Sequence, residues 1–487
     1  MSDVRPTHPL AYEAAVPVAG RIDRRVPLLL IAAAAYQAIL ALTEGLFNST
    51  LLMHTPLVIL LAWVAALAGP GGSKWTGRRL IGLTAGLLAA QAAVLAFTTH
   101  FYYFRPTALL GKAWPMAAIF LAAAAVLAAG AVRPAWRKWA VLVAVALHFC
   151  AAAWVIVLGI MPIIDVYLFH QDSAAAFLHG QNPFAITFPN VYGHTNRFYS
   201  DDVQVHGRVT FGFPYPPLSL FLYLPSYALT GESRYAHALA YALCGGGIAL
   251  LSRARAAAYA GALFLAAPAC FIVIESAWTE PFVLLMLVGV AMAAVHARRW
   301  LPVALGLFFA VKQYNVIFLP LLYLLLPGPI FSRATARFLG ILILTGAAVS
   351  LPLALWDWAA FWNSDVTIQV KQPFRFDALS FLAYAANVRP KDYVPPGWWS
   401  AIPFALLLPT WAVLLWRLPR DISGFVLGVG VTSIVFLFFN RQAFLNYHTF
   451  AAGSLLLAVA AIEAMREKES SVTLIPSPAT AEGHNCT

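Results

Sequence analysis

The sequence predicts an all-α polytopic membrane protein, on three observations. The chain has 487 residues, of which 61% are hydrophobic and 10% are charged, whereas soluble domains are about half apolar and about a quarter charged. Apolar runs recur along the whole length, each near the roughly 20 residues that an α-helix needs to cross a bilayer. Finally, no uninterrupted polar segment is long enough to form a large soluble domain.

Twelve apolar runs are candidate membrane spans: 27–43, 52–69, 80–97, 114–132, 139–160, 236–251, 256–274, 281–297, 338–356, 401–416, 422–439 and 445–464. Two more apolar stretches are short or broken, namely 216–230 and 301–327. We expect 301–327 to form a broken helix or hairpin and 216–230 a re-entrant or interfacial piece, because such elements are tolerated where protein or water satisfies the freed backbone groups. The expected fold is therefore a bundle of about 12–14 transmembrane helices.

The charged residues predict the orientation of this bundle. Most of the 31 lysines and arginines fall in one set of alternate loops, whereas most of the 20 acids fall in the other. The positive-inside rule places the basic set in the cytoplasm. Both termini are then cytoplasmic, and two long polar loops, about 161–216 and 357–400, face the other side. This asymmetry accounts for the net charge of +11, so we expect no nucleic acid partner.

The same pattern divides the chain into four parts. Residues 1–26 are polar and lack the apolar core of a secretory signal, so they form a cytoplasmic segment. Residues 27–138 supply four helices, and residues 139–464 form a module with the two long loops. The polar tail, 465–487, is expected to be disordered and cytoplasmic.

The first long loop opens with "DVYLFHQDSAAAFLHGQNPF" (165–184). Asp165 falls where a span leaves the membrane, and a carboxylate there is costly unless it faces a polar cavity. It is a candidate general base, although Asp also suits the start of a helix as a cap. A cluster with His170, Asp172 and His179 could hold a metal. Neither histidine pairs at a recognised ligand spacing, however, so packing within a polar loop is favoured and no metal is expected.

Two further stretches carry cations where apolar residues are expected. Lys312 interrupts "LGLFFAVKQYNVIFLPLL", and a lysine at that depth either snorkels or serves a site. Beside an external cavity it would suit a phosphate. Near the start of the last span, "NRQAFLNYH" brings Arg441, Gln442, Asn446 and His448 together. We interpret Arg441 as a candidate second phosphate contact.

For other polar stretches, a structural role is as well supported as a role in binding. In "ESAWTEP", Glu275 and Glu280 could bind sugar hydroxyls and Trp278 could stack on a ring, but tryptophan is also common at membrane interfaces. Lys371 and Arg375 could meet lipid head groups or a substrate, or simply be solvated. The turns "HGQNPF" and "FGFPYPPL" are accounted for by architecture alone.

Taken together, these stretches resemble the GT-C class of membrane glycosyltransferases, and especially the bacterial family 87 group, which includes actinobacterial mannosyltransferases. The resemblance covers roughly residues 140–464. The key aspartate of a GT-C module usually follows the first span, whereas here it follows the fifth, so four extra spans precede the module. The residues that carry the resemblance are Asp165, Tyr167, Gly180, Asn182, Pro183, Phe184, Phe213 to Pro217, Gly306, Leu307, Lys312, Pro320 and Gln442 to Tyr447.

The resemblance implies an inverting transfer of a hexose or pentose, with mannose favoured, from a polyprenyl-phosphate donor to an extracytoplasmic glycolipid or glycan acceptor. It also implies a multi-pass protein of a bacterial plasma membrane. Asp165 would be the general base, and Lys312 and Arg441, helped by His448, would stabilise the leaving phosphate. No cofactor and no metal are expected, and the partners are the donor, the acceptor and membrane lipids. The other expected substrate-binding residues are Tyr167, His170, Asn182, Tyr215, Glu275, Glu280, Gln442 and Asn446.

Two other classes of protein remain open. A transporter or flippase for a lipid-linked or anionic substrate also fits broken helices and buried ions. Against it, the halves show no obvious repeat, and two long external loops suit a catalytic vestibule better than a gate. The other class is a structural subunit of an envelope-assembly complex.

Overall fold

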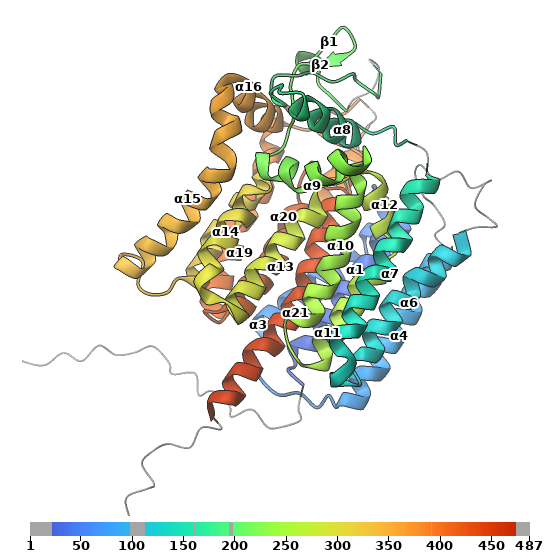
Figure 1. Ribbon diagram of the computed structural model, residues 1–487, viewed down its shortest axis with the longest axis vertical. Helices are drawn as coiled ribbons and strands as arrows, with labels where there is room; N and C mark the ends of the chain where they lie inside the picture. The colour runs from blue at the N-terminus through green and yellow to red at the C-terminus, as the bar shows by residue number, and fades with distance from the viewer. Residues whose placement is uncertain (1–21, 98–112, 160, 194–197, 391, 474–487) are drawn as a thin grey trace, which may run out of the picture.

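In the computed structural model (Figure 1), the chain forms a bundle of helices with one small β-hairpin. The structure describes residues 22–97, 113–159, 161–193, 198–390 and 392–473. Within these ranges, seven helices are long and apolar enough to cross a membrane, and five shorter apolar helices accompany them. The prediction of an all-α polytopic membrane protein is confirmed at this level.

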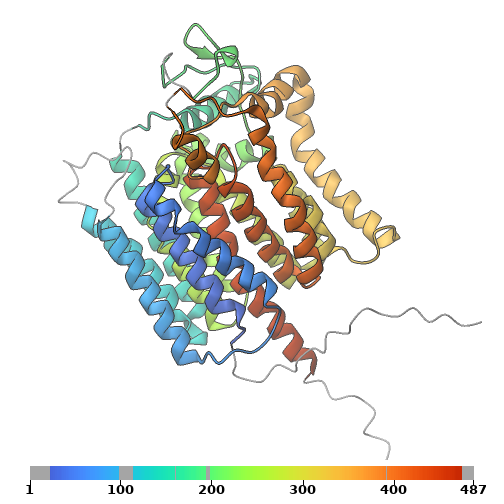
Figure 2. The same ribbon diagram turned by 180° about the vertical axis from the view of Figure 1, so that it is seen from behind.

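The four expected N-terminal spans are present as helices. They are α1 (Arg25–Thr43), the pair α2 (Ser49–Leu52) and α3 (Thr55–Leu67), α4 (Gly77–Phe97) and α6 (Ala113–Gly130). These helices lie along one side of the bundle (Figure 2). Helix α1 packs against the last helix of the chain, so the N-terminal part is built into the bundle.

The central helices are α7 (Arg137–Leu158), α10 (Arg234–Leu250), α11 (Arg255–Leu265), α12 (Cys270–Glu275) and α13 (Glu280–His296). The expected single span 256–274 is wrong in one respect, because it is divided into α11 and α12. The break contains Pro268, and proline lacks the N–H that a continuous helix needs.

The stretch 301–327 is a hairpin, one of the two forms expected for it. Helix α14 (Leu301–Ala310) leads to Lys312, and a long 3₁₀ helix, η4 (Gln313–Leu325), leads back. Leu301 and Leu324 line the same small cavity, together with Arg298 of the short 3₁₀ helix η3 (Arg298–Trp300). The two ends of the hairpin therefore meet, and Lys312 lies at its turn.

The C-terminal helices are α15 (Arg333–Trp356), α19 (Ile402–Arg417), α20 (Ile422–Phe438) and α21 (Leu445–Thr473). Helix α21 is buried along most of its length, in the middle of the bundle. It continues to Thr473, which corrects the expectation of a disordered tail from residue 465 onward. Residues 474–487 of that expected tail, and residues 1–21 of the expected N-terminal segment, lie outside the described residues.

Both long loops fold at one end of the bundle, which we call the loop end (Figure 1). The first loop contains α8 (Asp165–Leu178), the 3₁₀ turn η2 (Asp201–Val203) and the hairpin of β1 (Gln204–Val205) and β2 (Arg208–Val209), in which Gln204 pairs with Val209. Its turn residues His206 and Gly207 both have positive φ, as tight hairpins require. Helix α9 (Pro217–Thr230) follows and lies across this end of the bundle.

The second loop contains α16 (Trp358–Trp362), the π-helix η5 (Asn363–Thr367), α17 (Ile368–Lys371), α18 (Phe381–Asn387) and η6 (Gly397–Ala401). Ser364 ties it to the first loop. Its hydroxyl accepts a hydrogen bond from the Gly212 N–H at 2.8 Å and donates one to the Phe184 carbonyl at 3.1 Å. The two loops therefore form one layer.

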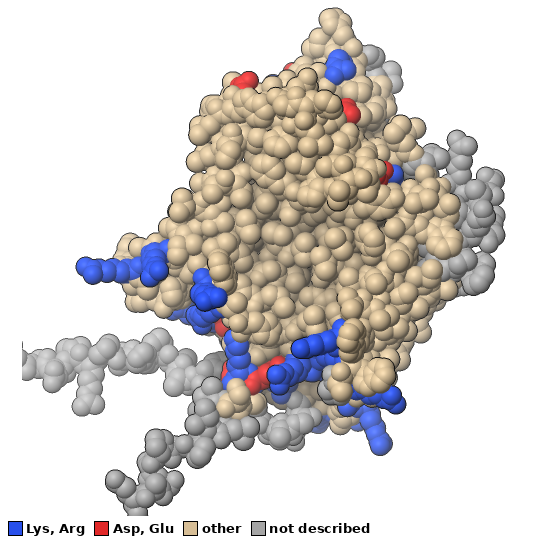
Figure 3. Space-filling model, viewed as in Figure 1, with Lys and Arg blue, Asp and Glu red and all other residues tan. Residues whose placement is uncertain are grey.

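Most of the lysines and arginines visible in Figure 3 gather at the opposite end, which we call the basic end. Arg333 at the start of α15 and Arg417 at the end of α19 mark it. The alternation of charge along the sequence thus becomes a separation of charge between the two ends of the bundle.

Candidate functional site

Two cavities of similar size lie under the loop layer. The Asp165 cavity has a volume of about 460 Å³, and its lining includes Asp165, Tyr192, Tyr199, Trp278, Arg375 and Asn446. The apolar cavity has a volume of about 480 Å³, and its lining includes Phe318, Phe404, Phe436, Leu437 and Phe450. Six residues line both cavities: Tyr215, Lys312, Gln369, Gln372, Gln442 and Tyr447. The two cavities therefore meet around Lys312.

Asp165 is the first residue of α8, and residues from its own loop hold its carboxylate in place. Oδ1 accepts hydrogen bonds from the Tyr192 hydroxyl at 2.9 Å and from the Val166 N–H at 2.7 Å. Oδ2 accepts a hydrogen bond from the Tyr199 hydroxyl. Burial, and then the charge of Asp165, raise the pKa of Tyr199 well above its usual value. Tyr199 therefore stays protonated at neutral pH and donates to Asp165.

Lys312 is buried at the turn between α14 and η4. Its Nζ donates to the Thr279 hydroxyl and lies 3.3 Å from Oε1 of Glu280. The same ammonium group lies 4.0 Å from the centre of the Tyr215 ring, which is a cation–π distance. The other oxygen of Glu280 accepts a hydrogen bond from the Asn446 side chain at 2.7 Å. Residues from three other segments thus fix the cation where the two cavities meet.

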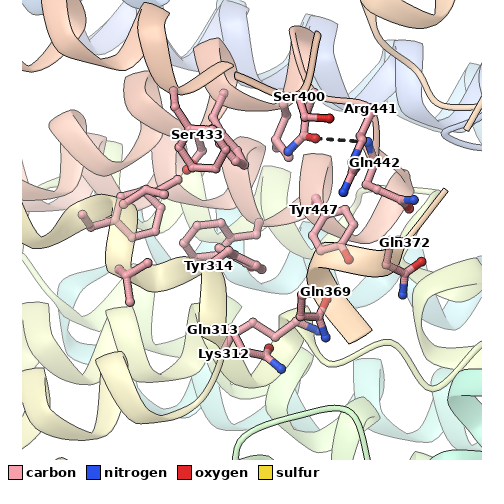
Figure 4. Close-up of a pocket in the computed structure, with 18 of the residues that line it drawn as sticks. Lys312, Gln313, Tyr314, Gln369, Gln372, Ser400, Ser433, Arg441, Gln442 and Tyr447 are labelled. Carbon is pink, nitrogen blue, oxygen red and sulfur yellow. Dashed lines mark hydrogen bonds between the residues drawn. The ribbon is translucent and has the colours of Figure 1, made fainter. Parts of the chain in front are cut away.

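The charged and amide side chains labelled in Figure 4 gather at one end of the apolar cavity, whereas Ser433 lies apart from them. Arg441 is half-buried there, and its Nη2 donates to the Val370 carbonyl at 3.1 Å. Neighbouring Gln442 donates to the Pro373 carbonyl at 2.7 Å. Among the described residues, no carboxylate forms an ion pair with Arg441, so its charge is available to an anion entering this cavity.

Asp365 is buried in the π-helix η5 of the second loop. The Gln313 side chain donates to its Oδ1 at 2.8 Å and to its backbone carbonyl at 3.2 Å. Burial raises the pKa of Asp365 to about 7, although the Gln313 hydrogen bond and the charge of Lys312 oppose the shift. Near neutral pH, Asp365 is therefore divided between its protonated and charged forms.

Several predicted site residues line the two cavities. Asp165 and Asn446 line the Asp165 cavity, Arg441 lines the apolar cavity, and Tyr215, Lys312 and Gln442 line both. Glu280 does not line either cavity but contacts Lys312 directly.

Tyr167 and Asn182 face other parts of the fold. The Tyr167 hydroxyl donates to Glu232 at 3.2 Å, near the end of α9. The side-chain oxygen of Asn182 accepts a hydrogen bond from the Phe184 N–H at 3.0 Å. That bond is typical of a turn, so here the architectural interpretation accounts for the residue.

His170, Glu275 and His448 are fully buried and line neither cavity. His170 packs against the rings of Tyr223 and His237. Nδ1 of His448 contacts the Tyr36 hydroxyl of α1. This histidine therefore joins the first helix to the last and does not reach the polar end of the apolar cavity.

The structure also brings in residues that the sequence did not single out as site residues. Tyr192 and Tyr199 contact Asp165, Gln369 and Gln372 line both cavities, and Glu44 lines the Asp165 cavity. The clustering of Tyr, Asn and Pro in the first loop was a possible signal for the two tyrosines. Glu44 follows an N-terminal span that has no counterpart in the resemblance, so nothing pointed to it.

Among the residues that the structure describes, no three His, Cys, Asp or Glu side chains are grouped so that they could hold a metal ion. In the comparisons with known proteins, the chain matches no family model, no curated protein and no solved structure. The function is therefore argued from the geometry of the two cavities.

Proposed function

We propose that the protein is a GT-C-like glycosyltransferase of a bacterial plasma membrane, with both termini cytoplasmic and the loop end outside. It moves a hexose or pentose, with mannose favoured, from a polyprenyl-phosphate donor to a glycolipid or glycan acceptor. One observation carries the proposal: a cavity containing a held carboxylate meets an apolar cavity at a buried lysine. The basic end then faces the cytoplasm, in keeping with the positive-inside rule.

The apolar cavity suits the donor lipid. Two of its lining residues, Val316 of η4 and Phe404 of α19, are 57% and 52% exposed. The cavity therefore opens sideways, where a prenyl chain can enter from the membrane. Burying each CH₂ group of that chain contributes about 0.8 kcal/mol. The donor phosphate lies at the polar end, near Arg441 and Lys312, since cations hold phosphate oxygens through charge-assisted hydrogen bonds.

The acceptor occupies the Asp165 cavity, and the reaction is a single displacement. The acceptor hydroxyl oxygen attacks the anomeric carbon as the bond from that carbon to the phosphate oxygen breaks. The hydroxyl proton passes to Asp165, and the polyprenyl phosphate leaves with the bonding electron pair. Proton transfer to a positioned base contributes about 10²–10⁴-fold to the rate.

Lys312 and Arg441 act on the leaving group. Negative charge grows on the phosphate as the bond breaks, and cations fixed beforehand stabilise it without reorganising. Glu280 holds Lys312 in position and offsets its charge when no donor is bound. Attack from the acceptor side, opposite the leaving phosphate, inverts the anomeric centre.

A transporter or flippase for a lipid-linked or anionic substrate is the alternative, and one observation favours it. The hairpin of α14 and η4 places Lys312 at a break between helices, and ion sites of transporters are built on such breaks. A transporter moves its lipid unchanged, whereas a transferase separates the sugar from the phosphate. The two functions thus differ in their products.

The test uses the full-length protein in lipid nanodiscs with radiolabelled polyprenyl-phosphate sugars and a lipid and glycan extract as acceptor. Asp165→Asn should reduce transfer by about 10²–10⁴-fold. Asp172→Asn is the matched control, because Asp172 lies on the same helix and lines neither cavity. Equal transfer by wild type and Asp165→Asn would remove Asp165 from the mechanism. Movement of intact donor across liposomes without transfer would favour the transporter.

A further inference from the structure

The N-terminal helices contribute directly to the Asp165 cavity. Glu44 and Leu46, in the connection between α1 and α2, are part of its lining. The connection is also tied to the second long loop, because Leu46 forms a β-bridge with Ala378 and the Phe47 N–H donates to the Asp377 carbonyl at 2.9 Å. The N-terminal region outside the GT-C resemblance therefore forms part of the wall of the candidate site, through the connection between α1 and α2.

A close backbone approach fixes the position of Glu44. Its φ is 54°, and that of Gly45 is 70°. A Cβ atom on Gly45 would overlap the backbone of Leu445, the first residue of α21. The Gly45 N–H is also bonded to the Thr43 hydroxyl at 3.1 Å. The connection thus fits closely against the residue that precedes Asn446, which also lines the cavity.

The charges of the Asp165 cavity are unsuited to an anionic ligand. Lys312 and Arg375 are the two cations among its described lining residues, and each already has a carboxylate. Lys312 is paired with Glu280, and the guanidinium of Arg375 is held by both oxygens of Asp377, at 2.8 and 2.7 Å. Lys312 serves the donor phosphate where the two cavities meet, Arg375 is held by Asp377, and the carboxylates of Asp165 and Glu44 in the same lining repel an anion.

The walls of the cavity suit a neutral sugar instead. The Arg375 guanidinium lies 4.0 Å from the ring centre of Phe198 and 4.5 Å from that of Phe444. Phe198, Phe444 and Trp278 all line the cavity, and aromatic rings provide apolar surfaces against which a sugar ring can pack. Carboxylates and amides supply directional hydrogen bonds to hydroxyls, and the cavity carries such groups on Asp165, Glu44, Gln369, Gln372, Gln442 and Asn446.

We infer that the acceptor is an uncharged sugar, and that Glu44, supplied by the N-terminal helices, binds one of its hydroxyls. The inference rests on the proposed function, because it takes the Asp165 cavity as the acceptor site. It gives the connection between α1 and α2 a role in choosing the acceptor. Glu44 acts on acceptor binding, and it takes no part in the departure of the phosphate.

The test is direct binding to the full-length protein in nanodiscs, without any donor. The probes are tritiated octyl glycosides of mannose, glucose, galactose and arabinose, together with octyl glucuronide as the anionic probe. Wild type should bind at least one neutral glycoside more tightly than the glucuronide. Glu44→Gln should weaken that binding by about 10-fold or more, since hydrogen bonds to charged groups are stronger than those between neutral groups. Asp202→Asn, an exposed acid of the first loop outside the cavity, should bind as wild type does.

A second variant, Leu46→Trp, narrows the cavity at the same wall without changing its charge and should also weaken binding. It replaces Glu44→Gln in the test if that variant does not fold. Unchanged binding by the folded variants, a preference for the glucuronide, or no binding of any neutral probe would overturn the inference. Sugar transfer from the polyprenyl-phosphate donor is measured in a separate assay. Loss of binding in Glu44→Gln, with no transfer by wild type, would sustain the sugar site and reject the transferase.

Discussion

Lys312 and Glu280 form an ion pair in the interior of the bundle, with Nζ and Oε1 3.3 Å apart and side chains 4% and 1% exposed. Such a pair contributes little net stability, because both charges lose their hydration. Removing one partner is different, since it leaves an uncompensated buried charge. The pair therefore holds a cation at the junction of the two cavities without leaving either charge alone.

Lys312→Met should reduce the free energy of unfolding by about 3–5 kcal/mol, because it leaves Glu280 charged and unpaired. The double variant Lys312→Met/Glu280→Met should recover most of that loss. Thermal unfolding in one detergent, at fixed pH, measures the stability of both variants. If the single variant were as stable as the double variant, the two groups would not be coupled in the folded protein.

Tyr199→Phe should lower the transfer rate about 10-fold or more, because Asp165 loses a hydrogen bond that orients its charged group. The Michaelis constant for the donor should stay the same, since Tyr199 does not line the apolar cavity. Steady-state kinetics at saturating acceptor measure the transfer rate and the Michaelis constant for the donor separately. Tyr323→Phe, at the basic end, is the control, and an unaltered rate in Tyr199→Phe would show that the hydroxyl does not position the base.

Asp365 should make stability depend on pH. Its pKa in the folded protein is about 7, above the ordinary aspartate value of 3.8, so Asp365 holds more protons in the folded state than in the unfolded state between these pH values. The contribution of Asp365 to stability is then greatest below about pH 4 and falls as the pH rises towards 7. Melting temperatures from pH 4 to 8 should show this decline in wild type, and it should be smaller in Asp365→Asn. Parallel plots of melting temperature against pH for the two proteins would show that Asp365 does not cause the decline.

Val316→Trp should obstruct the side opening of the apolar cavity. We expect the Michaelis constant for a long-chain polyprenyl-phosphate donor to rise by about 10-fold, which corresponds to about 1.4 kcal/mol of lost binding. A donor with a ten-carbon chain should be less affected, because less of its chain passes the opening. Leu344→Trp, exposed on α15 and outside both cavities, controls for added bulk. An equal effect on both donors would place the lipid elsewhere.

The helices were largely predictable because apolar runs of sufficient length have few alternatives in a membrane. The break between α11 and α12 was not predicted, although Pro268 marks it, since proline is tolerated inside many membrane helices. Lys312 was predictable as an unusual residue, and the hairpin was among the forms expected for its segment. Its pairing with Glu280 was not predictable, because the two residues are brought together by packing of separate helices.

The site residues show a similar limit. Polar residues in "NRQAFLNYH" were grouped by their closeness in sequence, but successive helical residues point in directions about 100° apart. Asn446 and Tyr447 consequently line the Asp165 cavity, while His448 contacts α1. Tyr199 and Glu44 come from a loop and a helix connection, where no periodic pattern indicates which way a side chain faces.

The contact of α1 with α21 has a consequence for how the protein is made. Tyr36 and His448, which join these helices, are 412 positions apart, and Gly45 fits against Leu445. Helix α1 is synthesised long before α21 and must wait in the membrane until α21 can pack against it. The wall of the Asp165 cavity is therefore completed only after α21 has been synthesised. Until then, the surface of α1 that α21 will cover faces lipid or the insertion machinery.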